Sequence, residues 1–296
     1  MSAVTEGLTR ASARRQAWRR GFYRFRQSWL SIAGLAIVLL LFVVAVAAPV
    51  LVPYPDQVTG GIDTAARFQP PSLAHLFGTN ELGQDVFTLT LAGARISLIA
   101  GIAVVLLGAA VGTLAGAVAG YVGGWVGEVI MRLSDLKLTI PGLILAMAVA
   151  AALGAGLVNT IIAIALTWWP GYARLVRGEV IAKKEEMFVQ AARALGAGTG
   201  RILRRHVIPN IISPIIVKMS LDMGFAILTV ASLGFIGIGV KPPTPEWGAL
   251  LSTARGYMPD FWWMAIFPGL AIFLAVFGFN LLGDGLRDVL DPKARR

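Results

Sequence analysis

Six long apolar stretches constrain the fold of this chain more than any other feature of its sequence. A helix needs about 20 mainly apolar residues to cross the hydrocarbon core of a bilayer, and each stretch reaches about that length. The stretches lie at roughly 29–51, 94–119, 128–153, 157–176, 210–236 and 262–283. We therefore predict an all-α integral membrane protein with six transmembrane helices.

The composition agrees with a membrane protein and argues against other classes. Charged residues make up only 14% of the chain, whereas about a quarter of a soluble domain is charged. The formal net charge is +10, but the positive residues lie at the edges of the apolar stretches, so we expect no nucleic-acid partner. There is no cysteine, and the two histidines, His75 and His206, are far apart in sequence. We therefore expect no disulfide, thiol nucleophile or metal site.

The positive residues also predict the orientation. Seven arginines precede the first span, eight Lys or Arg residues lie between spans four and five, and four close the chain. Such an excess of Lys and Arg is typical of cytoplasmic segments. We therefore expect both termini in the cytoplasm, with a basic segment over 1–28, a first transmembrane helix over 29–51, an external loop over 52–93 and a cytoplasmic tail over 285–296. A shorter external loop is expected around 237–261.

Aromatic residues before the first span recur at helical spacing. Trp18, Phe22, Phe25 and Trp29 fall on one face of a helix, with arginines between them. This pattern predicts an N-terminal interfacial helix on the inner membrane surface. A basic tail without regular structure is the alternative.

A row of glycines marks the second span. Gly108, Gly112, Gly116 and Gly120 recur every fourth residue, so they share one helix face. Small residues in such a row let a second helix approach closely within lipid. We interpret the row as helix packing within a tight bundle.

Charged residues inside the apolar stretches are candidates for function, because charges are costly in lipid. Lys218 and Asp222 in the fifth span are four residues apart and able to pair. They either face a wet pathway or another subunit, or Lys218 snorkels to the membrane edge with Asp222 as its counter-ion. Asp135 and Lys137 near the start of the third span raise the same two possibilities.

The chain carries no catalytic motif that we recognise. The glycine-rich GAGTGR at 196–201 lacks the GK dipeptide of a phosphate-binding P-loop, and no strand precedes it. A nucleophile elbow and an HExxH helix are also missing. We therefore expect a non-catalytic protein that binds no nucleotide or cofactor itself.

The basic segment between spans four and five has the pattern of two short helices. Residues 183–195 are good helix formers, Gly196 suits the turn after a helix, and Thr199 suits the start of the next. Pro209 then precedes the fifth span. A hairpin on the membrane surface with no partner is one interpretation, but it leaves the small Ala191 and Ala192 unexplained.

This segment resembles the EAA motif of ABC-importer permeases. The motif E-A-A-x-x-x-G is matched by Gln190, Ala191, Ala192 and Gly196, and the I-x-L-P that follows after nine residues is matched by His206, Val207, Ile208 and Pro209. The resemblance implies that 183–209 is a coupling segment that docks into a groove of a separate ATPase. Gln190 in place of Glu, and His206 in place of an apolar residue, depart from the motif.

Further stretches are similar to the C-type permease subunit of dipeptide, oligopeptide and nickel importers. They are HLFGTNELGQDVF (75–87), GARISL (93–98), GVKPPTPEWGALL (239–251) and FNLLGDGLRDVLDPK (279–293). Asn80 and Gln84 stand where Asp and Arg are expected. The resemblance implies a type I ABC-importer permease fold, with an ABC-type transmembrane permease domain over 94–284, in a bacterial inner membrane.

The same resemblance implies the partners and the activity. These are a second homologous permease subunit in a heterodimer, two cytoplasmic ATPase subunits that bind ATP and Mg²⁺, and an external solute-binding protein. The expected function is import of di- or oligopeptides, with nickel, glutathione or an oligosaccharide as alternatives. An ion-coupled secondary transporter is the competing class, and for it the four intramembrane charges would form a relay. A membrane-embedded enzyme is a more distant alternative.

Overall fold

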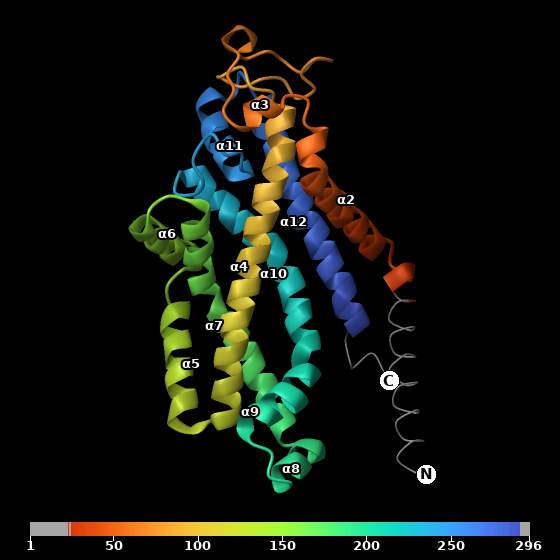
Figure 1. The fold of residues 1–296 in the computed structure, drawn as a ribbon, viewed down its shortest axis with the longest axis vertical. Coiled ribbons are helices and arrows are strands. Elements are labelled where there is room, and N and C mark those ends of the chain that lie inside the picture. The colour runs from red at the N-terminus through yellow and green to blue at the C-terminus, as the bar shows by residue number, and fades with distance from the viewer. Residues whose placement is uncertain (1–22, 24, 291–296) are drawn as a thin grey trace.

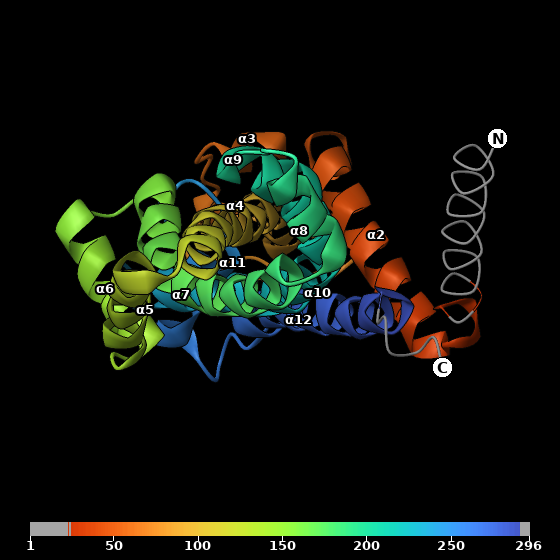
Figure 2. The same ribbon diagram turned by 90° about the horizontal axis from the view of Figure 1, so that it is seen from below.

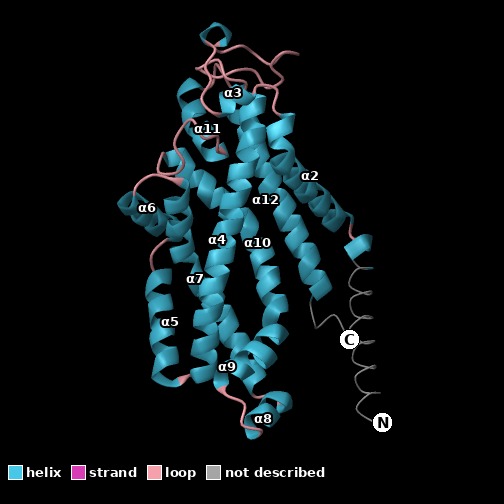
Figure 3. Cartoon of the chain, in the orientation of Figure 1, coloured by secondary structure: helices cyan, strands magenta, loops and turns pink. Residues whose placement is uncertain are grey.

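The computed structural model describes residues 23 and 25–290 (Figure 1). Over these residues every regular element is a helix, and β-type pairing is confined to an isolated bridge between Thr79 and Asp85 (Figure 3). The all-α prediction is therefore confirmed. Trp18 and Phe22 of the expected interfacial helix lie outside the described residues, so that helix stays a prediction.

The described part of the chain contains both long and short helices. The long helices are α2 (Trp29–Leu51), α4 (Val86–Val122), α5 (Gly124–Leu138), α6 (Gly142–Leu153), α7 (Leu157–Lys184), α10 (Ile208–Ile236) and α12 (Trp263–Leu290). The short ones are α3 (Pro55–Val58), α8 (Met187–Ala194), α9 (Thr199–Ile202) and α11 (Trp247–Ala254). A π-helical turn, Leu203–Val207, joins α9 to α10.

Most of the predicted spans reappear as helices. Four stretches are long and apolar enough to cross a membrane on their own, namely α2, α4, residues 199–236 around α10, and α12. The pair α5 and α6 meets the same test only when taken together. α7 covers the predicted fourth span but does not meet the test. By length and composition, the described residues thus support four or five of the six predicted spans.

The third predicted span, 128–153, is not a single helix, and that prediction was wrong. α5 ends at Leu138, α6 begins at Gly142, and their axes differ by 92°. Pro141 lies in the break; it has no backbone N–H to continue the helix, and its ring disfavours helical geometry at Ile140. The two helices form an angled pair at one side of the bundle (Figure 1).

The second predicted span begins earlier than expected. α4 starts at Val86 rather than near residue 94, because Asp85 caps it by accepting a hydrogen bond from the Thr88 backbone N–H at 2.7 Å. The helix runs for 37 residues to Val122 and is followed by Gly123, whose φ of 67° favours glycine. The predicted external loop over 52–93 therefore includes the first two turns of α4.

α4 runs through the bundle, with α7 packed along much of its length and α10 also against it (Figure 2). α12 packs against α10, and α2 lies against α12 and α4. The shared core includes Leu98 and Val104 of α4, Ile164 of α7, Ile227 of α10 and Ala275 of α12. Other long helices thus pack against α4 on several sides, while one face of it, which includes Val111 and Leu114, stays exposed.

The two ends of the bundle differ in structure. At one end lie residues 52–85 and 237–262, which include α3 and α11 and which we call the cap (Figure 1). At the other end lie α8, α9 and the turn between them, residues 187–202, which we call the hairpin (Figure 1). The candidate functional residues lie at these two ends and along the helices that connect them.

Candidate functional site

The hairpin has one buried side and one exposed apolar side. Val189 is fully buried and packs in a cluster with Ile202 and Val207. On the outer side, Met187 is 87% exposed and Leu195 is 88% exposed, and the exposed Ala191 lies between them at four-residue spacing. Large apolar side chains with that exposure are typical of a surface that another molecule covers. The outer side of α8 is therefore a candidate docking surface.

The residues of the predicted coupling segment divide between these two sides. Gln190 and Ala191 face outward, whereas Ala192 is half-buried against the cluster beneath α8. Gly196 makes the turn with φ of 79°. His206 is half-buried in the π-helical turn with its ring centre 6.5 Å from that of Phe188. Exposed Pro209 lies in the first turn of α10.

Gln190 makes a contact that a glutamate in its place would not make. Its Nε2 donates a hydrogen bond to the backbone carbonyl of Glu185 at 3.1 Å. An ionised carboxylate has no proton to donate, so the interaction requires the amide. The departure from the motif thus adds a local tie between α8 and the residue that ends α7.

The hairpin also contacts the end of α4. The Arg193 guanidinium lies over the Tyr121 ring at 5.7 Å from its centre. Ala117 of α4 belongs to the same buried cluster as Val189. Movement of the hairpin would therefore act directly on α4.

The glycine row of α4 faces α7. A Cβ atom added at Gly112, Gly116 or Gly120 would lie closer than 3.0 Å to α7, whereas one at Gly108 would lie 3.3 Å from the Trp168 Cβ. The nearest atoms include the backbone carbonyl oxygen of Trp169 for Gly112. The two backbones approach so closely that a side chain has no room at these three positions.

Lys218 and Asp222 pair on α10, with Lys218 Nζ 3.0 Å from Asp222 Oδ2. The Lys218 side chain is 32% exposed and that of Asp222 is 17% exposed. The same Nζ lies 4.9 Å from the centre of the Tyr172 ring on α7. Asp222 is one turn further from the hairpin, so the amine is not directed toward the nearer end of α10. Both predicted roles of the pair include this Lys218–Asp222 contact, so the pathway role stays a prediction.

Neither Asp135 nor Lys137 forms an ion pair with Lys218 or Asp222. Asp135 of α5 instead pairs with Arg174 of α7. Among the described residues, the ion pairs found do not include Lys137. Asp135 thus ties the angled α5 to the bundle, and no chain of ion pairs among the described residues joins the four intramembrane charges into one relay.

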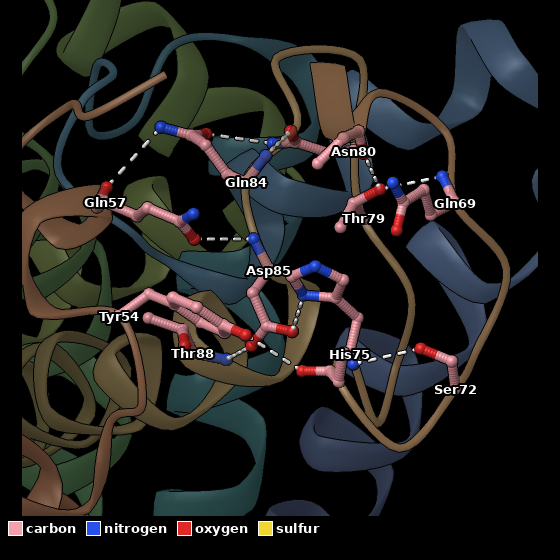
Figure 4. Close-up of polar contacts among 12 residues, drawn as sticks. Tyr54, Gln57, Gln69, Ser72, His75, Thr79, Asn80, Gln84, Asp85 and Thr88 are labelled. Atoms are coloured by element: carbon pink, nitrogen blue, oxygen red, sulfur yellow. Dashed lines mark hydrogen bonds and ion pairs between the residues drawn. The ribbon is translucent and has the colours of Figure 1, made fainter. Parts of the chain in front are cut away.

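The cap is organised by buried polar side chains (Figure 4). Asn80 Nδ2 donates to Gln84 Oε1 at 2.9 Å, and Gln84 Nε2 donates to the Gly61 carbonyl at 2.9 Å. His75 Nδ1 lies 3.1 Å from Asp85 Oδ1, and Asp85 is 1% exposed. Asn80 and Gln84 thus form an uncharged, hydrogen-bonded pair at the two positions where Asp and Arg are expected.

A second buried acid lies where the cap meets the bundle. Glu246 is 1% exposed and caps α11; its Oε2 accepts from the Ala249 N–H at 2.9 Å and its Oε1 from Ser97 Oγ of α4 at 3.1 Å. Burial raises the pKa of Glu246 above its ordinary value of 4.5. Glu246 was not predicted from the sequence, although an acid directly before a short helix is a recognisable capping signal.

Two family descriptions match the chain. Residues 112–296 match the family described as binding-protein-dependent transport system inner membrane component. The chain belongs to this family. Residues 13–71 of the permease match the family described as N-terminal TM domain of oligopeptide transport permease C. The predicted membership in the ABC-importer permeases of the peptide and oligopeptide class is thus confirmed.

Named relatives cover almost the whole permease. It is 46% identical over 281 residues to the glutathione transport system permease protein GsiD of Escherichia coli O157:H7 and to that of Shigella boydii serotype 4. Each alignment covers 95% of the permease and 92% of the relative. Together with the apolar helices, these matches support a multi-pass inner-membrane transport subunit.

Proposed function

We propose that the permease is one of two related transmembrane subunits in an ATP-driven importer of di- or oligopeptides, including glutathione. Two cytoplasmic ATPases bind ATP and Mg²⁺, and this chain supplies part of the path. Both termini and the hairpin lie in the cytoplasm, and the cap receives the solute-binding protein on the outside. The observation that carries the proposal is the exposed apolar stripe of Met187, Ala191 and Leu195 on a hairpin packed against α4.

The mechanism is alternating access. ATP-driven closure of the ATPase pair moves α8, and the contact of Arg193 with Tyr121 carries this movement to α4. Since α7 is packed against the glycine row, α4 and α7 move together. The pathway between the two permeases then opens alternately to the two sides.

The substrate is proposed from the relatives and the family. The relatives named glutathione transport system permease at 46% identity support glutathione, which is itself a tripeptide. The match to the oligopeptide permease family supports peptides more widely. Nickel and oligosaccharides remain alternatives that a transport assay separates. For an ion-coupled transporter, uptake would instead follow an ion gradient with this chain alone.

The test is uptake by the complete transporter in proteoliposomes, with the partner permease, both ATPases and the binding protein present. Labelled glutathione, trialanine, an oligosaccharide and Ni²⁺ are supplied in turn, with ATP or with a non-hydrolysable analogue. We expect uptake of glutathione or trialanine that requires hydrolysable ATP. Uptake by the purified chain alone, driven by a proton or sodium gradient, would contradict the proposal.

A second measurement separates this chain from the ATPases. The purified permease should show no ATPase activity above that of empty micelles, and activity should appear only when the ATPase subunits are added. Robust nucleotide turnover by the permease alone would refute its assignment as a non-catalytic subunit.

A further inference from the structure

The Lys218–Asp222 pair lies near the middle of α10. At 1.5 Å per residue, Lys218 is about 15 Å and Asp222 about 21 Å from residue 208, where α10 begins. Phe225 lies one turn beyond Asp222 and two turns beyond Lys218 on the same side of the helix and is 60% exposed. Charges at this depth are costly next to lipid. The face must therefore meet water, a solute or another protein.

Lys218 is supported on one side and open on the other. The Tyr172 ring lies against its ammonium group, and a Cβ added at neighbouring Gly171 would lie 3.6 Å from Lys218 Cε. The Tyr172 hydroxyl is buried next to the Asp222 carboxylate. The side chain is thus held by α7, while about a third of it remains exposed. Three N–H donors and the free lone pairs of Asp222 allow further bonds on the open side.

We propose that Lys218 and Asp222 bind an α-amino-acid head group, in which one carbon carries both an ammonium and a carboxylate. The proposal rests on the proposed function, since the γ-glutamyl end of glutathione carries such a head. The ligand carboxylate accepts from Lys218 and the ligand ammonium donates to Asp222. Two antiparallel charge pairs then lie side by side, so no net charge is left unpaired at this depth.

The short separation within the pair decides which ligand fits. Lys218 Nζ and Asp222 Oδ2 are 3.0 Å apart. In an α-amino-acid head, standard bond lengths place the ammonium nitrogen about 2.5 Å from the carboxyl carbon. In an extended dipeptide, the two charged termini are at least about 5 Å apart. The site therefore favours glutathione over an ordinary peptide, whose termini cannot engage both residues in this way.

The experiment compares three substrates in the reconstituted complete transporter at concentrations that saturate the binding protein. They are glutathione, glutaryl-cysteinylglycine, which lacks the α-ammonium, and the glutathione analogue whose γ-glutamyl α-carboxylate is an amide. The variants are Asp222→Asn and Lys218→Met. The control is Glu128→Gln with Arg132→Met, which removes an exposed pair of the same four-residue spacing on α5. The same binding protein delivers every substrate, so its own preference cancels when variant and wild-type ratios are compared.

We expect the glutathione-to-glutaryl uptake ratio to fall about tenfold or more in Asp222→Asn, the size of one charged hydrogen bond. The glutathione-to-amide ratio should fall similarly in Lys218→Met, and both ratios should be unchanged in the control. Each ratio compares the uptake of two substrates by the same preparation of one variant, so a loss of active protein lowers both uptakes and leaves the ratio unchanged. Wild-type ratios retained in both variants would overturn the site while leaving the peptide importer intact. Equal wild-type uptake of all three substrates would overturn the site even if a variant failed to assemble. Absence of any ATP-dependent uptake by the wild type would overturn both proposals.

Discussion

Replacing Gly112 with alanine should loosen α4 from α7. The added Cβ would lie closer than 3.0 Å to the Trp169 carbonyl oxygen and to the Tyr172 Cβ. Neither atom is the end of a flexible side chain, so α7 itself has to move. Forcing a methyl group into a packed contact costs about 1–3 kcal/mol, and alanine recovers about 1 kcal/mol of helix propensity. Both contacts fall below 3.0 Å, so the packing cost lies in the upper part of that range, at about 2–3 kcal/mol, and we expect a net loss of about 1–2 kcal/mol.

Gly108→Ala is the matched control, since it adds the same methyl group to the same face of α4. Its Cβ would lie 3.3 Å from the Trp168 Cβ and 3.9 Å, an ordinary contact distance, from two further atoms of Trp168 and Tyr172. The small cost of that contact is offset by the propensity gain, so this variant should match the wild type to within about 0.5 kcal/mol.

The free energies of unfolding can be measured by titrating each variant in mild detergent with sodium dodecyl sulfate. The intrinsic tryptophan fluorescence, to which Trp168 and Trp169 at the α4–α7 contact contribute, follows the unfolding of the bundle. If Gly112→Ala proved as stable as Gly108→Ala, the close backbone approach inferred for this contact would be refuted.

Further predictions concern the hairpin, the cap and the orientation. Gln190→Glu loses one exposed hydrogen bond of about 1 kcal/mol or less, so ATP-dependent uptake should stay within about twofold of wild type. Ala191→Trp should abolish uptake but not insertion, because bulk on the outer side of α8 blocks docking; normal uptake would argue against that interface. The folded state binds the Glu246 proton more tightly than the unfolded chain, so the stability of the wild type should fall as pH rises from about 4.5 through the raised pKa. Glu246→Gln should flatten that slope in thermal unfolding, and an unchanged slope would contradict the assignment. For orientation, a cysteine replacing the 99% exposed Leu73 should react with an impermeant thiol reagent from outside, and one replacing Gly198 should not; the reverse pattern would invert the topology.

The helical nature of the chain and most of its spans could be predicted because few backbone conformations are stable in lipid. An apolar stretch of sufficient length has to satisfy its own backbone, and the periodicity of the glycine row sets which residues share a face. The sequence does not say which helix meets that face. That α7 does so depends on the packing of the whole bundle.

The errors have local physical causes. Apolar residues continue on both sides of Pro141, so hydropathy over 128–153 hides the break that the proline makes. The apolar stretch alone indicates a start near residue 94, but α4 begins directly after Asp85, which caps it at Thr88. Asp is a favoured residue at that position, so Asp85 was the sequence signal for the start.

The cap was the least predictable region. Its bonds join residues far apart in the chain, such as Gln84 with Gly61 and Ser97 with Glu246. A loop has no periodic pattern to reveal such partners, because its conformation is fixed by tertiary contacts. Its individual polar residues are visible in the sequence, but their pairing is not.

The length of α4 has a mechanical consequence. With 37 residues it is about 55 Å long, whereas the hydrocarbon core is only about 30 Å thick. One unbroken rod therefore reaches from Asp85 in the cap to Tyr121 beside the hairpin. A tilt of about 10° about its midpoint would displace each end by about 5 Å in opposite directions. A rigid-body tilt of α4 thus moves the cap end and the hairpin end at the same time, with no chain of side-chain rearrangements between them.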